Sequence, residues 1–241
     1  MKVDLPDIKS VKSGSTNVKK ICHGLQELWP NYQPYTLYDW CQNSDPAYIN
    51  TGIKPRSHWI YEGKIKITTR NNSWFAFFGS QENITYGSNS GVVVIKNSNY
   101  PEVRYQYGGT SYTTGTGNSL NVGDVYEFKI DGFNKFVWFS INSSYVKRKD
   151  FASVTIPDIQ LSLGDMYIFG RTWNGGFDPD RGGHTYPCKF YYVKITDGDT
   201  NKVIHHWLPA VSNNVHGMVD IITGIFYSNA NSSGTLTCGN D

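Results

Sequence analysis

Runs of alternating apolar and polar residues, short enough for β-strands, recur along most of the chain. The segment at 60–68, IYEGKIKIT, alternates as a strand with one buried face does. The clearest hairpin is the segment at 125–142, with Asp131-Gly132 at its turn. Further strand-like runs lie at 48–55, 74–80, 91–96, 102–107 and 161–170, and Gly, Asn or Asp separates most of them. Without long helical periodicity, this punctuation predicts a two-sheet β-sandwich rather than alternating strands and helices.

The segment nearest the C-terminus carries the strongest turn signals. The run FYYVKI at 190–195 stops at 197–199, Asp-Gly-Asp, where glycine supplies the positive φ of a tight turn. A return strand follows and is predicted to end at Pro209, because proline cannot donate a ladder hydrogen bond. Trp207 on this strand is predicted to be buried. Gly224 is predicted to reverse the chain between two more short apolar runs.

The first thirty-odd residues differ from the rest. Residues 14–30 contain two short runs around His23-Gly24, which predicts a small β-ribbon. Because two short strands bury too little surface to be stable alone, we expect the ribbon to pack on another chain. A flexible leader with a local hairpin is the alternative. Residues 34–45, which are rich in aromatic and polar side chains, are predicted to be a linker to the sandwich.

Two parts of the chain resemble bacteriophage structural proteins. The motifs YINTGIKP, FFGS, IFGR, FYYVKITDGDTNKVIHHWLPA and MVDIITGIFYSN together look like the concanavalin A-like (laminin G-like) jelly-roll domain of phage and prophage structural proteins, over approximately 48–239. In one departure, HHWLPA stands where that family commonly has an acidic or arginine-bearing variant, which leaves fine specificity open. The N-terminus resembles a short phage element, GST-x-V-x-K-I-x-x-G-x-x-x-x-W, which is matched at Gly14, Ser15, Thr16, Val18, Lys20, Ile21, Gly24 and Trp29.

The resemblance implies a virion protein, either a head or tail fibre subunit or a decoration subunit. Residues 1–34 would anchor it to other virion proteins or join copies into a homo-oligomer, and residues 35–241 would form the concanavalin A-like jelly roll that attaches to host surface polysaccharide. The anchoring side chains implied are Val18, Ile21, Leu28 and Trp29. Two alternatives stay open: a carbohydrate-binding or glycoside-processing module, and a structural virion adaptor that touches only other virion proteins.

Charge and composition argue against several classes of partner. The net charge is +2 and the pI is ≈ 8.2, whereas a nucleic-acid-binding protein would usually be more basic. The short basic run at 147–149 is predicted to be a solvated loop, so we expect no nucleic-acid partner. Residues 1–15 contain no apolar stretch of signal-peptide kind, and no later segment has the length of a membrane span. The sequence therefore predicts synthesis in the host bacterial cytoplasm and no membrane insertion. The four cysteines lack CxxC spacing and are predicted to be free thiols.

The motifs that would indicate catalysis are missing from the sequence. A retaining glycosidase needs two carboxylates about 5 Å apart, and its relatives with this fold carry them on one strand as E-x-D-x-x-E. Here the glutamates are isolated, and aspartate boxes and GxSxG are missing, so we expect no catalytic residue and no enzyme activity. His205 and His206 adjoin on a strand and face opposite sides, so they cannot chelate a metal together. One is expected to be buried and hydrogen-bonded and the other to face solvent.

The loop at 171–184, RTWNGGFDPDRGGH, is the predicted binding site. Its aromatic side chains can stack on a sugar face, and its amide and carboxylate oxygens can accept hydrogen bonds or coordinate calcium, although no cofactor is required. The predicted glycan-binding residues are Trp173, Asn174, Phe177, Asp178, Asp180, Arg181 and His184. The alternative is a surface loop whose aromatics cover a sheet edge or a neighbouring subunit. The stretch at 105–120, rich in Tyr and Gly, is either a second contact surface or an ordinary strand that runs into a loop.

Overall fold

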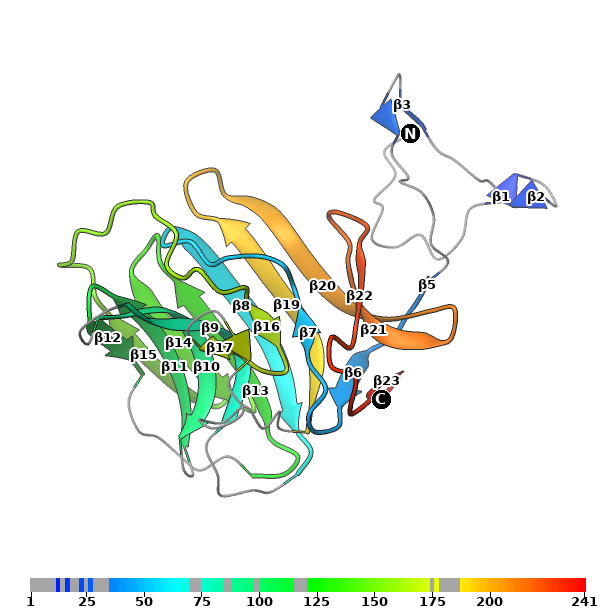
Figure 1. Ribbon diagram of the computed structural model, residues 1–241, viewed down its shortest axis with the longest axis horizontal. Helices are drawn as coiled ribbons and strands as arrows, with labels where there is room; N and C mark the ends of the chain where they lie inside the picture. Colours follow the sequence, from blue (N-terminus) through cyan, green and yellow to red (C-terminus); the bar gives the residue numbers. More distant parts are fainter. Residues whose placement is uncertain are drawn as a thin grey trace.

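The chain forms an all-β structure, as the sequence predicts. The computed structural model describes residues 35–69, 75–84, 88–97, 100–114, 121–173, 176–177 and 187–241 (Figure 1). It also describes the backbone of four two-residue strands, β1 Lys12–Ser13, β2 Thr16–Asn17, β3 Cys22–His23 and β4 Gln26–Glu27. None of the described residues forms a helix, so no membrane-spanning helix occurs among them.

One layer is an eight-stranded sheet in the order β12-β11-β10-β9-β16-β7, with β17 beside β9 and β18 beside β17. All its ladders are antiparallel except the short β17–β9 pair. Its strands are β7 Ile49–Asn50, β9 Phe75–Ile84, β10 Ser88–Asn97, β11 Tyr100–Tyr107, β12 Thr110–Thr113, β16 Tyr167–Ile168, β17 Thr172–Trp173 and β18 Gly176–Phe177. Of the run predicted at 161–170, only the two residues of β16 are strand.

The other layer is an eleven-stranded antiparallel sheet in the order β15-β14-β13-β8-β19-β20-β21-β22, with β5, β6 and β23 joined to it. Its strands are β5 Tyr35–Leu37, β6 Trp40–Asn43, β8 Trp59–Ile67, β13 Val125–Asp131, β14 Phe136–Ile141, β15 Tyr145–Asp150, β19 Cys188–Asp197, β20 Lys202–Ser212, β21 Val215–Asp220, β22 Phe226–Ser228 and β23 Leu236–Gly239. Both predicted hairpins are present, β13–β14 and β19–β20. In the second turn the residue with positive φ is Asn201, at +54, and not Gly198 as predicted.

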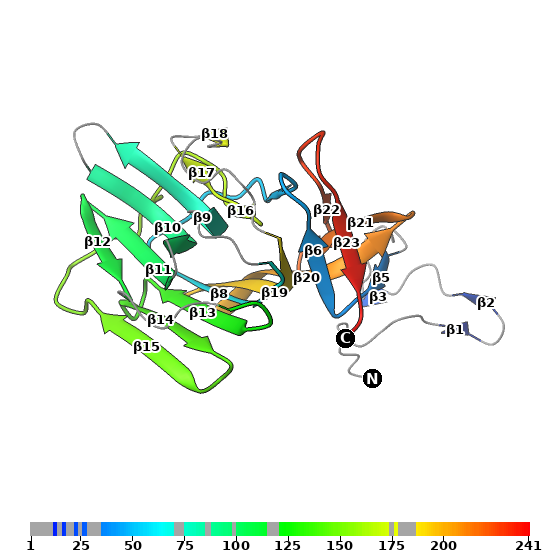
Figure 2. The same ribbon diagram turned by 90° about the horizontal axis from the view of Figure 1, so that it is seen from below.

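The core lies between the two sheets, which are stacked as separate layers in Figure 2. Inward side chains alternate with outward ones along each long strand, so aromatic rings of the two layers meet. Phe78 on β9 stacks on Phe128 on β13 with ring centroids 5.7 Å apart, and Tyr105 on β11 stacks on Phe151 at 5.0 Å. The result is a jelly-roll-like sandwich whose main core lies between the layers, with a second small buried cluster of Ala76, Val93 and Ile95 in the eight-stranded sheet.

The prediction that residues 34–45 form a linker is wrong. Two strands within this segment, β5 and β6, belong to the eleven-stranded sheet. β19 and β20 pair only as far as Trp207, after which β20 pairs with β5 instead (Figure 1). The strand β6 continues alongside β19, with Cys41 opposite Phe190. Cys41 is fully buried. The segment therefore fills the wedge where two long strands diverge, and its buried Asn43 accepts a hydrogen bond from the Cys188 backbone N–H at 3.1 Å.

Pro209 does not end β20, which continues to Ser212. Its carbonyl oxygen accepts a hydrogen bond from the backbone N–H of Tyr38, 3.0 Å away. A residue in a strand points its N and C=O to the same side, so the N–H that proline lacks would also face this wedge. Because the β19–β20 ladder ends at Trp207, no strand on that side needs a hydrogen bond from the nitrogen of Pro209. On the other edge Pro209 pairs with Met218 of β21.

The basic run at 147–149 is also different from its prediction. It lies within the edge strand β15 rather than in a loop, with Arg148 directly opposite Trp138 of β14. Charged residues on an edge strand discourage pairing with another chain. Gly224, by contrast, behaves as predicted: its φ of +76 reverses the chain between β21 and β22.

The N-terminal ladder occurs at the predicted ribbon. β3 pairs with β4, with Cys22 opposite Glu27 and His23 opposite Gln26, and β1 pairs with β2. The four side chains expected to anchor the protein lie outside the described residues; these are Val18, Ile21, Leu28 and Trp29.

We expect Trp207→Ala to lower the free energy of unfolding by about 3–5 kcal/mol, because it deletes a large core side chain. Trp207 is fully buried, as predicted, and packs against His205 and Tyr227. Urea denaturation measures the loss. Val203→Ala on the same strand is the control, because Val203 is 40% exposed and should change stability by under about 0.5 kcal/mol.

Candidate functional site

The predicted loop at 171–184 lies largely beyond the part of the chain that the structure describes. Of its predicted binding residues, Trp173 and Phe177 are described only as backbone in β17 and β18. The other five lie outside the described residues; these are Asn174, Asp178, Asp180, Arg181 and His184. The start of the loop is held in the sandwich, because the Thr172 hydroxyl donates to Ser80 Oγ at 2.7 Å. Glycan and calcium binding by this loop stay predictions.

The tyrosine-rich stretch contributes to the core where it is described. Tyr105 is fully buried, and Tyr112 stacks on Phe151 with ring centroids 4.5 Å apart. These two rings therefore have the structural role that was one of the two alternatives.

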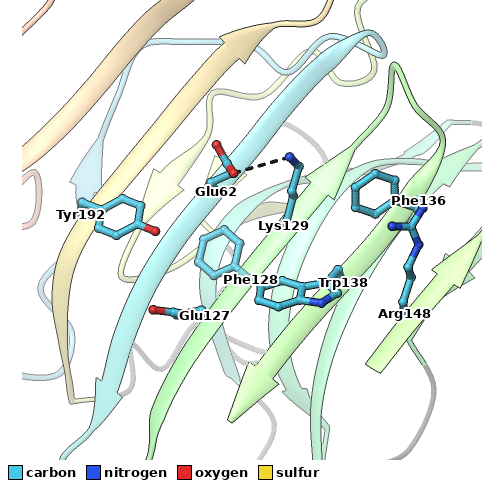
Figure 3. A pocket seen from close by; sticks show the side chains of 8 residues that line it. All are labelled: Glu62, Glu127, Phe128, Lys129, Phe136, Trp138, Arg148 and Tyr192. Atoms are coloured by element: carbon cyan, nitrogen blue, oxygen red, sulfur yellow. Dashed lines mark ion pairs between the residues drawn. The ribbon is translucent and has the colours of Figure 1, made fainter. Parts of the chain in front are cut away.

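A pocket of ≈ 390 Å³ lies instead on the outer face of the eleven-stranded sheet (Figure 3). Its side chains come from five neighbouring strands, β19, β8, β13, β14 and β15. It combines three half-buried aromatic residues with charged residues of both signs. The lining residues are Glu62, Glu127, Phe128, Lys129, Phe136, Trp138, Arg148 and Tyr192.

Strand alternation and register bring these side chains together. On β13, Phe128 points into the core and is 2% exposed, whereas its neighbours Glu127 and Lys129 point outward. Lys129 lies directly opposite Glu62 of β8. Gly63, beside Glu62, is opposite Phe128, and a Cβ at Gly63 would come within 2.5 Å of the Phe128 ring. Glycine at this position leaves room on the core side for the ring of Phe128, which packs beneath the pocket.

Ion pairs across the strands occupy the centre of the pocket. Glu62 binds Lys194 of β19 at 2.7 Å through one oxygen and Lys129 of β13 at 3.6 Å through the other. Glu127 is paired with Lys64 at 3.7 Å. All of these side chains are about one quarter to one third exposed. Each pocket glutamate therefore faces a cation from a neighbouring strand.

Aromatic side chains form the two walls. On one side, the Arg148 guanidinium lies 3.8 Å from the centroid of the Phe136 ring, and Trp138 stands beside them (Figure 3). On the other side is Tyr192. Burial raises the pKa of Tyr192, and the carboxylates of Glu127 and Glu62 raise it further, so its phenol stays protonated and can donate a hydrogen bond.

Sequence reasoning missed this pocket. Glu62 and Glu127 are isolated along the chain, yet the pairing of β8 with β13 places both in one pocket. Arg148 belongs to the basic run that was expected to be a solvated loop. The one local signal was the exposed Glu-x-Lys pattern, present at both 62–64 and 127–129. This pattern predicts that both strands expose a charged face, but it does not predict that β8 and β13 are neighbours.

The two adjacent histidines face opposite sides of β20, as predicted. Nδ1 of His205 bonds Oδ2 of Asp220 at 2.8 Å, and its ring stacks on Trp207. His206 faces the outer side and meets Tyr192 edge to face. His205 is thus hydrogen-bonded, as expected of one of the two, and both side chains are partly buried. No group of three or more potential metal ligands occurs among the described residues.

No family model matches the chain, and no curated protein matches its sequence. Among solved structures, a candidate carbohydrate binding protein from Bacteroides ovatus ATCC 8483 is similar with a TM-score of 0.55 and 14% identity, over 84% of this chain and 60% of that one. The heptameric SAP-like pentraxin from Limulus polyphemus has a TM-score of 0.44 and 10% identity, over 84% and 96%. Tailspike protein 2 of Escherichia coli O157:H7 bacteriophage CAB120 has a TM-score of 0.36 and 14% identity, over 69% and 22%. At this identity the first similarity shows the β-sandwich fold.

Asp220 should make the stability of the sandwich depend on acid pH. Burial alone would raise the pKa of this carboxyl, but hydrogen bonds from His205, the His206 amide and Thr223 outweigh burial and lower the pKa. Because the pKa of Asp220 is lower in the folded state, its carboxylate stabilises the fold fully at pH values above the pKa of an unfolded Asp, about 3.9. This stabilisation is lost as the pH falls through the pKa of the folded state.

We therefore expect Asp220→Asn to cost roughly 1.5–3 kcal/mol at pH 7, the range for hydrogen bonds to a charged group. The gap between variant and wild type should narrow at pH 3, as measured by urea unfolding at both values. Asp150→Asn removes an exposed carboxylate and should change little at either pH. An equal gap at pH 7 and pH 3 would contradict the assignment.

Proposed function

We propose that this chain is a non-catalytic bacteriophage virion subunit whose β-sandwich binds a glycan of the host surface in the outer-face pocket. The observation that carries the binding role is the pocket itself: aromatic walls around a centre of charged side chains, held on five rigid strands. Sites built on strands hold their side chains more precisely than sites on loops do. This pocket replaces the loop at 171–184 as the leading binding site.

The side chains of the pocket suit a sugar ring. Trp138 and Phe136 offer flat apolar faces to the C–H groups of the ring, while hydroxyl groups need both donors and acceptors at the edge. The Tyr192 phenol and the Arg148 guanidinium donate, and the carboxylates accept. Because the pocket contains charges of both signs, it fits a hydroxyl-rich ligand better than a highly charged one.

The contacts of the two glutamates support binding over hydrolysis. A glycosidase needs one carboxylic acid placed to protonate the leaving group. Here Glu62 is paired with two lysines and Glu127 with one, so both carboxylates are engaged in ion pairs across the strands.

The virion assignment is supported by the resemblance of the N-terminal element and of the jelly-roll motifs to phage structural proteins. In this proposal residues 1–34 attach the chain to other virion proteins, and fibre or decoration subunits of this kind form homo-oligomers. The sandwich is then displayed outward with its pocket accessible. The alternative, an adaptor that contacts only virion proteins, predicts an intact fold with no affinity for glycans.

Trp138→Ala should weaken glycan binding at least about tenfold, because a central aromatic contact is worth on the order of 2 kcal/mol. An array of host surface polysaccharides identifies the ligand, and calorimetry on the best ligand measures the loss. Arg148→Ala should also weaken binding. Its matched control is Lys149→Ala, which removes the same charge from the adjacent position, where the side chain faces the other side of β15.

Two outcomes of this experiment would contradict the assignment. If Trp173→Ala abolishes binding while Trp138→Ala does not, the glycan site is the loop at 171–184. If the folded wild-type protein binds no polysaccharide on the array, the sandwich is a structural adaptor.

Deleting residues 1–30 should prevent incorporation into virions while the sandwich stays folded, because the described core begins at residue 35. Quantitative proteomics of purified particles measures incorporation, and circular dichroism of the truncated protein checks its fold. Particles that carry the truncated chain at the wild-type level would show that the N-terminal segment is not the anchor. Wild-type particles that lack the chain would disprove the virion assignment.

A further inference from the structure

Two of the buried cysteines face each other across neighbouring strands. Cys41 on β6 lies directly opposite Cys238 on β23 in the antiparallel ladder. Cys41 is fully buried and Cys238 is 7% exposed, and both belong to the same core cluster. Both are free thiols, as predicted, and the Cys238 Sγ atom lies 3.3 Å from the carbonyl oxygens of Ala210 and of Gly217, which accept its hydrogen bond.

The backbone shows that this is a non-hydrogen-bonded pair. The N–H of Cys238 donates to Nδ1 of His216 at 2.9 Å, away from β6. Three positions along the ladder, the Ser44 N–H donates to the Thr235 carbonyl, which fixes the alternation of bonded and non-bonded pairs. Side chains approach most closely at non-hydrogen-bonded pairs, where the Cα atoms are about 4.5 Å apart. That separation lies within the range of about 4.4–6.8 Å that a disulfide spans.

The surroundings give the two thiols different reactivities. Burial raises the pKa of Cys41. A hydrogen bond from the Cys41 thiol lowers the pKa of Cys238 to about 7. Burial acts in the opposite direction, and His216 lowers the pKa further. Cys238 is also the more exposed of the two, at 7% against 0% for Cys41. Since the thiolate is the nucleophile, Cys238 is the thiol that would react first.

We propose that Cys41 and Cys238 form a redox modification site, which closes to a disulfide by exchange with a small-molecule disulfide such as oxidised glutathione. The Cys238 thiolate attacks one sulfur of the reagent, forming a mixed disulfide and releasing one glutathione thiolate. Cys41 then loses its proton and attacks the Cys238 sulfur, releasing the second glutathione. The two cysteines lose two electrons and two protons, and the reagent becomes two thiols.

The third described cysteine does not belong to this site. Cys188 on β19 is buried, and the β6–β19 register places Phe190, not Cys188, opposite Cys41. Cys188 is therefore a diagonal neighbour of Cys41, and such pairs are about 7–8 Å apart, beyond the usual reach of a disulfide. The structure thus selects one pairing among the described cysteines.

The bond would tie down the C-terminal strand. Within the described sheet, the only strand that forms a ladder with β23 is β6, along one edge. A disulfide here links the first part of the sandwich to its last strand and so restricts the unfolded chain over almost the whole fold. This inference does not depend on glycan binding or on a place in the virion.

The test uses the purified full-length protein, incubated with oxidised glutathione and then alkylated under denaturing conditions. We expect the oxidised protein to take up two alkyl groups where the reduced protein takes up four, and non-reducing peptide mapping to link Cys41 to Cys238. The thermal midpoint, measured before alkylation, should rise by several degrees relative to the reduced protein. A Cys41–Cys188 link, a link to Cys22, or retention of all four thiols would each overturn the proposal.

Single substitutions separate the two steps. Cys41→Ala should stop at the mixed disulfide and gain the mass of one glutathione at Cys238. Cys238→Ala should gain neither a disulfide nor glutathione at Cys41, and Cys188→Ala is the matched control that should oxidise like the wild type. Peptide mapping of the wild type needs no variant to fold, so it decides the pairing even if a substitution destabilises the sandwich. Glutathione on Cys41 in Cys238→Ala would refute the assigned order of attack.

Discussion

The register of β8 between β13 and β19 is the constraint on which the rest of the structure depends. One side of β8 supplies Tyr61 and Ile65 to the core, and the other supplies Glu62 to the pocket. Because side chains alternate with a period of two, a slip by one residue would turn the charged side inward and the core side outward. Burying unpaired lysines and glutamates is far costlier than any local rearrangement. The core therefore fixes the register, and the register in turn assembles the pocket.

A second constraint is the divergence of β19 and β20. Two long strands that part within a sheet would leave unpaired backbone groups at a buried edge, which a folded protein avoids. The segment 35–43 fills this opening, and β23 adds to its far side through β6. The strand β6, near the start of the sandwich, and β23, its last strand, are thus neighbours (Figure 2). The opening between β19 and β20 is therefore filled by strands from the beginning and from the end of the sandwich sequence.

Local signals in the sequence predicted local structure well. Alternation located the long strands, and the glycine at 224 and the turn at 131–132 marked reversals that the structure contains. The failures concern neighbours that no local pattern specifies. Pro209 continues its strand because the edge it faces changes partners there. The pocket was unpredictable for the same reason, since it depends on the order of five strands. The glycan-binding loop and the anchor stay predictions.

The floor of the pocket has a consequence for how its specificity can change. Phe128 closes the pocket from below, yet it is a core residue that stacks on Phe78 of the opposite sheet. A substitution that deepened the floor would open a cavity between the two layers and weaken folding. Substitutions in the walls of the pocket should not weaken folding in this way, because the wall side chains lie outside the core. Variation among related sequences should therefore concentrate at positions such as Trp138, Arg148 and Tyr192, while Gly63 and Phe128 change together or not at all.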